Sequence, residues 1–362
     1  MHRISVVAVA LILLLLPVVY AQQADTPAPD ALPAVSPTPM PQVTIAAVGD
    51  MMLGNWGVEK LRINGVNYPF EQVAPYLQKA DITTGNLEGP HCNTGEAHPD
   101  KKYTFRIPPQ WMGGYKWAGF DVVTLSNNHA MDFGGECLLE CIDALSALGI
   151  KKCGGGKNLS DANQPAVIEK NGVKVAFLGY SATYPKDAWA TPGKPGTVFP
   201  EHNLLVQTVQ KAAAENDLLV VQFHWGEEGR ADPKEYQVNL AHLVIDNGAD
   251  LVIGHHPHIL QGVESYKGRL IFYSLGNFTF ASYSTRAKTS AIAQVALNKD
   301  GSTVSAKVVP VNVYNYDVQL QPVPMPGDSA VIGELRAKSS MIKGGIAASI
   351  ADDGTVNHPE TP

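Results

Sequence analysis

Strand-like and helix-like segments alternate along most of the chain, and this alternation limits the folds that it can adopt. Apolar runs typical of buried strands lie at residues 43–48, 81–84, 121–125, 173–179, 218–223 and 250–253. Helical patterns lie between them at 69–79, 109–118, 133–148, 201–215 and 234–247. Strands are also expected at 165–170, 270–274, 289–297 and 304–313. Helices that follow strands predict a layered α/β fold with largely parallel central strands, to which the later strands add antiparallel or edge pieces.

Polar side chains follow five of these expected strands. The candidate metal ligands among them are Asp50, Glu88, Asn128, His224, His256 and His258. Because sites in open α/β sheets form outside the carboxyl ends of the strands, we expect these side chains to meet at one edge. Carboxylate, amide and imidazole ligands suit Mn, Fe or Zn, so the sequence predicts a divalent metal centre of one or two ions.

Each of these residues also has a simpler interpretation. An Asp after a strand is usually a turn or capping residue, and a lone His224 is more often a core or surface histidine. The segment His256-Pro257-His258 is a stronger signal, because the proline holds two imidazoles close together. Five of the eleven histidines fall at three strand ends, which favours a shared site.

The N-terminal segment is typical of an exported protein. Residues 4–20 form an apolar run that is shorter than the roughly 20 residues of a spanning helix, and small residues precede a cleavage site after Ala21. Residues 1–21 are therefore predicted to be a signal peptide, with retention as an anchor as the alternative. Residues 22–42 are rich in proline and predict a spacer, although a leader without a role has the same composition.

Charge and cysteine content limit the partners and the compartment. The net charge is −7 and no basic run occurs, which argues against nucleic acid as a partner. The four cysteines suit a periplasmic, envelope or extracellular location. Cys137 and Cys141 are four residues apart and share one face of a predicted helix, so they suit separate partners better than each other. We therefore expect the pairs Cys92–Cys137 and Cys141–Cys153. A zinc site is the alternative, but the chain lacks a C-x-x-C pair.

Six short segments, in this order, resemble the bacterial capsule-synthesis protein CapA family, which is associated with poly-γ-glutamate synthesis. They are residues 49–54, 86–88, 126–134, 224–226, 254–258 and 273–278. The resemblance covers roughly residues 43–315. The family is similar in fold to calcineurin-like metallophosphatases, so it implies a four-layer α/β sandwich with mixed central sheets and a two-metal centre. We expect this domain at 43–320, followed by an extension at 321–362 with a helix at 331–340 and loose residues after it.

The resemblance also implies roles for individual residues. The six candidate ligands match positions that bind metal, and His129 matches a general acid or oxyanion stabiliser. Asp132 joins His129 as a candidate catalytic residue. Two departures from the phosphatase pattern put one metal site in doubt: Met52 stands where a His is usual, and Asn86-Leu87-Glu88 replaces Gly-Asp-x-x-Asp. His255 or Asp132 is a candidate substitute ligand. Glu227 or Glu228 could be a metal ligand, a residue that contacts the substrate or only a surface residue.

Two functions remain open from the sequence. The first is a metal-dependent hydrolase that acts on a phosphoester or polymer linkage at the envelope, with Arg106 and Arg230 as candidate anion-binding residues. Surface ion pairing is the simpler role for either arginine. The second is a non-catalytic, metal-containing scaffold that binds poly-γ-glutamate or a capsular polysaccharide beside membrane-bound synthesis machinery. Since the chain is acidic, bound cations would help either function with an anionic polymer.

Overall fold

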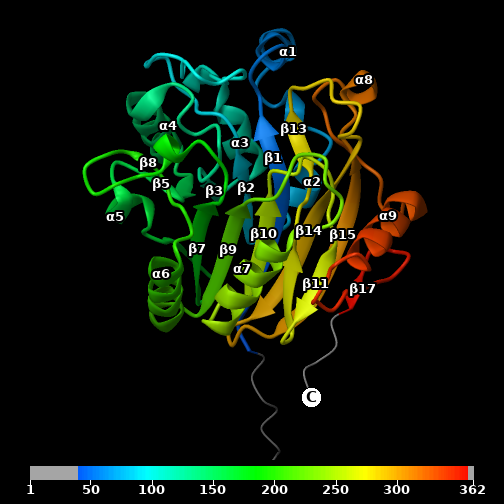
Figure 1. The fold of residues 1–362 in the computed structure, drawn as a ribbon. Coiled ribbons are helices and arrows are strands. Elements are labelled where there is room, and N and C mark those ends of the chain that lie inside the picture. Colours follow the sequence, from blue (N-terminus) through cyan, green and yellow to red (C-terminus); the bar gives the residue numbers. More distant parts are fainter. Residues whose placement is uncertain (1–39, 358–362) are drawn as a thin grey trace, which may run out of the picture. The chain divides into compact units, whose positions relative to one another are not determined.

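The computed structural model describes residues 40–357, so the predicted signal peptide and most of the spacer lie outside the described part. Two β-sheets form its centre (Figure 1). The larger sheet has the order β16 (Val323–Pro324), β15 (Thr303–Asn312), β14 (Thr289–Asn298), β1 (Gln42–Met52), β2 (Ile82–Leu87), β3 (Val122–Thr124), β4 (Lys151–Cys153), with β13 (Asn277–Phe280) also on β1. The smaller sheet has the order β11 (Val263–Tyr266), β12 (Arg269–Phe272), β10 (Leu251–His255), β9 (Leu218–His224), β7 (Val173–Ser181), β6 (Ala166–Lys170).

Both sheets are mixed, as expected. Strands β1 to β4 pair in parallel, whereas β14 and β15 join the larger sheet antiparallel. Strands β7, β9, β10 and β12 pair in parallel, and β6 and β11 close the two edges antiparallel. The β6–β7 hairpin turns at Asn171-Gly172, as that dipeptide predicts. In Figure 1 the arrowheads of β1, β7, β9 and β10 point to the same end of the molecule.

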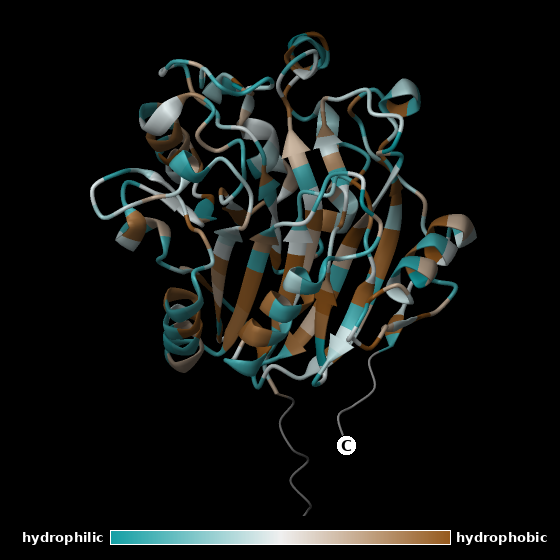
Figure 2. Cartoon of the chain, viewed as in Figure 1, coloured by the Kyte–Doolittle hydropathy of each residue, from teal (hydrophilic) through white to brown (hydrophobic). Residues whose placement is uncertain are grey.

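Alternating side chains along the strands build the layers. In β1, Ile45 and Ala47 face the core between the sheets, whereas Ala46 and Val48 face a second core. Residues of α3 (Gly113–Ala118) and α4 (Gly134–Ala147) contribute to that second core. Residues of α6 (His202–Glu215) and α7 (Glu235–Asp246) form a third core on the outer face of the smaller sheet. Figure 2 shows the central strands mostly in hydrophobic colours, whereas the helices around them mix hydrophobic and hydrophilic residues. The predicted four-layer α/β sandwich is confirmed.

Some elements differ from the sequence-based expectation. The helix expected at 69–79 is interrupted and forms a 3-10 turn at Tyr68–Phe70 and α2 (Ala74–Leu77). Pro75 explains the break, because proline lacks the amide hydrogen that a continuous helix needs. Helix α1 (Gly57–Asn64) and the short strands β4, β11 and β13 were not predicted, because segments this short carry little periodicity. No helix among the described residues is long and apolar enough to cross a membrane.

The C-terminal segment is ordered as far as residue 357, so the expectation of loose residues after 340 is wrong for this part. Helix α9 (Ser329–Ser339) matches the predicted helix, and β17 (Ser349–Ile350) pairs with β18 (Val356–Asn357). The physical reason is burial: Ile350 and Val356 contribute to the core between the sheets.

Of the two expected disulfides, one is confirmed and one is wrong. Cys92 and Cys137 are bonded, whereas Cys141 and Cys153 are buried free thiols. Cys141 belongs to α4 and faces the second core, whereas Cys153 lies in the core between the sheets. The larger sheet therefore separates them, which sequence spacing alone does not reveal.

A candidate metal centre at the carboxyl ends of the strands

The two sheets bring their carboxyl-terminal strand ends together, and the predicted ligands meet there. Asp50 lies in β1 and is in register with Asn86 of β2, while His224 of β9 is in register with His255 of β10. The side chains of Asn86 and His224 approach to 3.3 Å between Nδ2 and Nδ1, so the larger and smaller sheets touch at this point. Asp50, Glu88 and His224 are fully buried.

Asn86 occupies the middle of this arrangement. Its Nδ2 donates to Asp50 Oδ1 at 2.8 Å and to Glu88 Oε2 at 3.2 Å. Its Oδ1 accepts from Asn127 Nδ2 at 2.9 Å. Asn86 therefore holds the two carboxylates side by side, and Asn127 fixes the orientation of Asn86. Both asparagines support the centre, although neither was among the predicted ligands.

Two histidines lie in the turn after β10, and both have an unusual backbone conformation. His256 and His258 have φ values of 96° and 58°, a region that non-glycine residues seldom adopt. The His256 amide donates to Asp50 Oδ2 at 3.2 Å. His258 Nδ1 lies 3.2 Å from Asp50 Oδ2 and 2.9 Å from Asn277 Oδ1. A strained backbone conformation persists only where surrounding contacts stabilise it. Here Asp50 and Asn277 of the candidate site make those contacts.

His129 lies beside the carboxylates and is oriented by Asp132. Its Nδ1 lies 2.7 Å from Asp132 Oδ2, and its Nε2 lies 3.9 Å from Glu88 Oε1. The buried Asp132 carboxylate also accepts hydrogen bonds from the Phe105 amide at 2.6 Å and from Lys101 Nζ. Since Lys101 and the Phe105 amide both donate to the Asp132 carboxylate, its oxygens act as acceptors and receive the Nδ1 hydrogen of His129. The Nε2 lone pair of His129 therefore faces Glu88.

Burial and charge shift the protonation of the centre in opposite directions. Burial opposes ionisation of Asp50, but the neighbouring imidazoles of His255 and His258 hold its pKa well below the usual value. Burial raises the pKa of Glu88 well above its usual value and lowers the pKa of His256 to about 3. Burial also disfavours charge on His258, yet Glu88 and Asp50 raise its pKa to about 10. The charges of Asp50 and Glu88 thus favour a positive charge beside them, at the position of His258.

The residues present fit a divalent cation. One ligand atom from each of Asp50, Glu88 and His224 can be chosen so that all lie within 4.8 Å of one another, and the same is true of Glu228, His256 and His258. Glu88 Oε1, His255 Nδ1 and His256 Nδ1 are buried without a hydrogen-bond partner among the described residues. Buried polar atoms are normally satisfied, so these atoms are suited to metal coordination.

A cleft of about 790 Å³ opens onto the centre. His129, His258 and Glu228 line it at the site, and Trp56, Tyr103, Tyr283 and Arg286 line it elsewhere. The Trp56 and Tyr283 rings stack at 4.7 Å between centroids and form an aromatic wall. Because the buried Glu88 lies 3.7 Å from His258 Nε2, the carboxylates sit directly behind the histidines of the cleft.

The two predicted anion-binding arginines lie outside the lining of this cleft. The Arg106 guanidinium stacks 4.3 Å over the Phe133 ring. Arg230 is paired with Asp232 at 2.8 Å and with Glu227 at 3.8 Å, which neutralises its charge. Arg286 lines the cleft instead, and sequence reasoning missed it because no motif contains it.

The other predicted site residues converge. Asn128 Oδ1 lies 2.8 Å from His224 Nε2, so Asn128 lies with the other five candidate ligands. Lys101 and Asn277 were missed. Asn277 belongs to the segment 273–278 that carries the family resemblance, so a signal for it existed. Lys101 lies in a loop with no pattern of its own, and only the fold brings it to Asp132.

Two stacked mixed sheets with a carboxylate and imidazole centre define an α/β protein that carries a candidate divalent-metal site. Residues 44–282 match the model of the family described as bacterial capsule synthesis protein PGA_cap. The chain belongs to this family.

Two similar proteins carry the name CapA. The capsule biosynthesis protein CapA of Bacillus anthracis is 36% identical over 75% of this chain and 68% of its own length. The PGA biosynthesis protein CapA of Bacillus subtilis is 33% identical over 81% of this chain and 77% of its own length. A solved structure of a putative 5'-nucleotidase from Staphylococcus aureus is 17% identical, with a TM-score of 0.45, over 74% of this chain and 54% of that chain.

Proposed function

We propose that the protein acts at the cell envelope in the synthesis or export of a capsule polymer such as poly-γ-glutamate, as a metal-dependent hydrolase of a phosphoester or polymer linkage. The observation that carries the proposal is the buried group of Asp50, Glu88 and His224 behind the cleft, with His129 beside it. Family membership and the CapA relatives support the capsule-related part. Export rests on the signal-like sequence of residues 1–21.

The proposed chemistry assigns a task to each side chain. A divalent cation, when bound, would lower the pKa of a water molecule and polarise the phosphoryl or carbonyl oxygen of the substrate. Asp50, Glu88, Asn128, His224, His256 and His258 would hold this cation. Asp132 keeps the Nδ1 hydrogen of His129 in place, so that Nε2 can bind a proton and return it to the leaving group. The buried position of His129 limits access of bulk water to this nitrogen.

The side chains that line the cleft support the proposal that the substrate is an extended anionic molecule. Arg286 supplies a guanidinium, which can bind a carboxylate or a phosphate through two parallel hydrogen bonds. Trp56, Tyr283 and the exposed Tyr103 offer flat surfaces to the apolar parts of a chain. In this proposal Arg286, rather than Arg106 or Arg230, is the main anion-binding side chain of the site.

A hydrolysis assay tests the enzymatic part. Wild-type protein loaded with Mn²⁺, Fe²⁺ or Zn²⁺ is incubated with a generic phosphodiester and with a γ-linked glutamate oligomer. We expect turnover of one of them with at least one metal, and loss of that turnover in Asp50→Ala and His256→Ala. Absence of turnover of both substrates with every metal would overturn the hydrolase proposal.

A second candidate is a metal-containing scaffold that binds an anionic polymer without cleaving it. The observation that favours it is Met52, which brings a thioether rather than an imidazole to the cleft beside the centre. Equilibrium binding of labelled poly-γ-glutamate, with and without chelator, tests this candidate. Binding that is intact without turnover, lost on chelation and weakened by Arg286→Gln would support the scaffold, whereas unchanged binding on chelation would count against it.

A further inference from the structure

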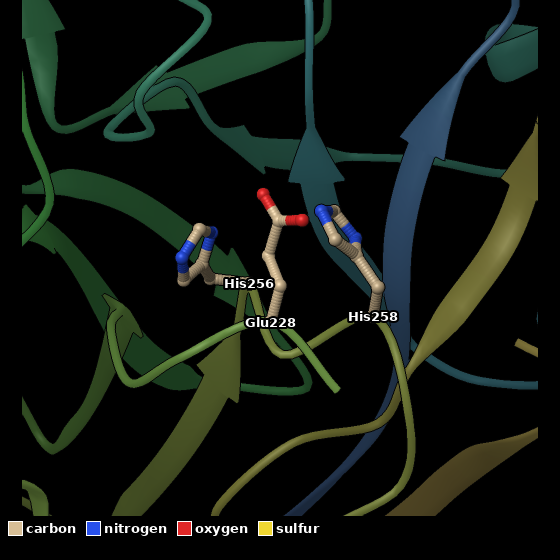
Figure 3. A group of neighbouring side chains, drawn as sticks. All are labelled: Glu228, His256 and His258. Atoms are coloured by element: carbon tan, nitrogen blue, oxygen red, sulfur yellow. The ribbon is translucent and has the colours of Figure 1, made fainter. Parts of the chain in front are cut away.

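Glu228 is the one exposed member of the candidate metal centre. It follows β9 in a loop that also contains Gly226 and Gly229, both of which have positive φ. Figure 3 shows its side chain between the imidazole rings of His256 and His258, with one ligand atom of each residue within 4.8 Å of the others. This carboxylate therefore reaches back from the surface toward two histidines on another loop.

Two further observations indicate that this position is a ligand position. His256 is 8% exposed, and its Nδ1 has no hydrogen-bond partner among the described residues. The Gly229 amide donates to the Pro257 carbonyl at 2.8 Å, which fixes the Glu228 loop against the turn that carries both histidines. Such a contact keeps Glu228 near the imidazoles. The loop therefore loses less conformational entropy when Glu228 binds an ion.

Met52 and Glu228 line the same cleft. Met52 stands two residues after Asp50, where the resemblance leads us to expect an imidazole, and its thioether is a poor ligand for hard divalent cations. We infer that Glu228 is a direct ligand of a second divalent cation, held together with His256 and His258, and that it replaces the ligand missing at Met52. This inference rests on the metal centre of the proposed function and adds the number of ions and the identity of one ligand.

The two ions differ in how tightly they are held. Asp50, Glu88 and His224 are fully buried and fixed by Asn86, so the first ion is held by a rigid group. Glu228 is exposed and belongs to a surface loop, so the second ion exchanges more easily. His258 Nε2 lies 3.7 Å from Glu88 Oε1 and His258 also belongs to the Glu228 group, which places it between the two groups of candidate ligands.

The neighbouring Glu227 is a matched control. Its carboxylate lies 2.9 Å from Lys234 Nζ and 3.8 Å from Arg230 Nη1, and it is not part of the histidine group. Glu227→Gln and Glu228→Gln therefore make the same chemical change one residue apart in the same loop. Only the second variant removes a charge that faces His256 and His258.

The experiment measures bound metal rather than turnover. Wild-type protein, Glu228→Gln and Glu227→Gln are dialysed to equilibrium over a range of Mn²⁺ concentrations, and bound Mn²⁺ is counted by elemental analysis. We expect two ions in the wild type and in Glu227→Gln. In Glu228→Gln we expect one tight ion and a second that is weakened about 100-fold or more, since loss of even an outer partner weakens metal binding 10- to 100-fold. Far-ultraviolet circular dichroism checks that each variant is folded.

The outcomes separate this inference from the proposed function. Two ions of unchanged affinity in Glu228→Gln, or a single ion in the wild type, would overturn the role of Glu228 and leave the buried metal centre in place. Wild-type protein that binds no Mn²⁺, and no Fe²⁺ or Zn²⁺ in the same dialysis, would overturn both. Wild-type protein that binds two ions, depends on Glu228 for one of them and hydrolyses neither test substrate with Mn²⁺, Fe²⁺ or Zn²⁺ would support Glu228 and overturn the hydrolase.

Discussion

Asp132 determines which nitrogen of His129 faces the cleft. The carboxylate is fully buried and accepts hydrogen bonds from Lys101 and the Phe105 amide, so its oxygens are oriented as acceptors and hold the Nδ1 hydrogen of His129. An asparagine has nearly the same shape, but its single side-chain oxygen would have to accept from Lys101, the Phe105 amide and His129 Nδ1, which the two oxygens of the aspartate share. The Nδ1 hydrogen of His129 would then be held weakly, and the tautomer with a hydrogen rather than a lone pair on Nε2 would become populated.

We therefore predict that Asp132→Asn lowers kcat for phosphodiester hydrolysis by about 100-fold or more and changes KM little, as wrong-tautomer variants do. Steady-state kinetics over a range of pH measure the effect, and the ionisation of His129 should move in the pH profile. The control is Asp187→Asn, because Asp187 pairs with His98 at 2.8 Å but is largely exposed. Equal effects of the two substitutions would contradict the positioning role of Asp132.

His91 is also a buried histidine, but it lies outside the metal group. Its ring packs edge-on against Tyr115 at 5.4 Å, and burial lowers its pKa to about 3. Burial raises the pKa of the neighbouring Tyr115 well above its usual value and that of Cys141 to about 12, so neither titrates in acid. In the unfolded chain His91 titrates near 6.5. Between these values the unfolded state binds one more proton than the native state.

It follows that His91 makes the protein less stable as the pH falls from about 6.5 toward 3. We predict that His91→Phe, which keeps the aromatic contact, reduces the slope of unfolding free energy against pH by about 1.4 kcal/mol per pH unit in this range. Urea unfolding at several pH values measures the slope. Identical slopes for the wild type and the variant would show that His91 is protonated in the native state.

At the scale of elements, the site depends on the close approach of β1 to the segment before β13. A Cβ on Gly49 would lie 1.8 Å from the Gly276 carbonyl oxygen, so no other residue fits there. The same carbonyl accepts a hydrogen bond from the Asp50 amide at 2.9 Å. Asp50 and Asn277 are in register across the two strands, so this contact also positions Asn277 beside His258.

Gly49→Ala should therefore force the two strands apart, lower the unfolding free energy by about 3 kcal/mol and weaken Mn²⁺ binding. The matched control is Gly333→Ala in α9, where an added Cβ meets no atom within 4 Å. That change should stabilise the protein by about 0.5–1 kcal/mol, since alanine favours a helix. Denaturant unfolding measures both variants. A Gly49→Ala protein as stable as the wild type would contradict the close approach.

At the scale of the whole molecule, the disulfide joins two of the segments that carry the site. Cys92 follows the Glu88 segment and Cys137 lies in α4, directly after the loop of His129 and Asp132. The bond closes a loop across a sequence separation of 45. In the chain-entropy account, a loop of this size contributes about 3–4 kcal/mol to stability.

We predict that the double variant Cys92→Ser, Cys137→Ser loses about 3–4 kcal/mol of unfolding free energy and binds Mn²⁺ more weakly. The control is Cys141→Ala, which removes one buried thiol and leaves the disulfide intact. Alkylation of the unreduced, denatured wild type, followed by mass spectrometry, should label two cysteines. Labelling of all four would show that the disulfide does not form.

The sequence by itself determined the layered fold and most of the candidate site. The alternation of strands and helices predicts the α/β layers, because each strand must bury both faces. Residues at strand ends such as Asp50, His224 and His256 were identifiable because parallel strands direct their carboxyl ends to one edge. The pair Cys92–Cys137 was also predicted from the sequence.

Only the tertiary structure decided the contacts between distant segments. The roles of Asn86, Lys101 and Arg286 depend on side chains that meet across the two sheets or across loops, and no local pattern encodes such meetings. Cys141 and Cys153 are close in sequence, but the larger sheet lies between them. Local periodicity determines which face of an element is buried, whereas the packing of the sheets determines which side chains share a site.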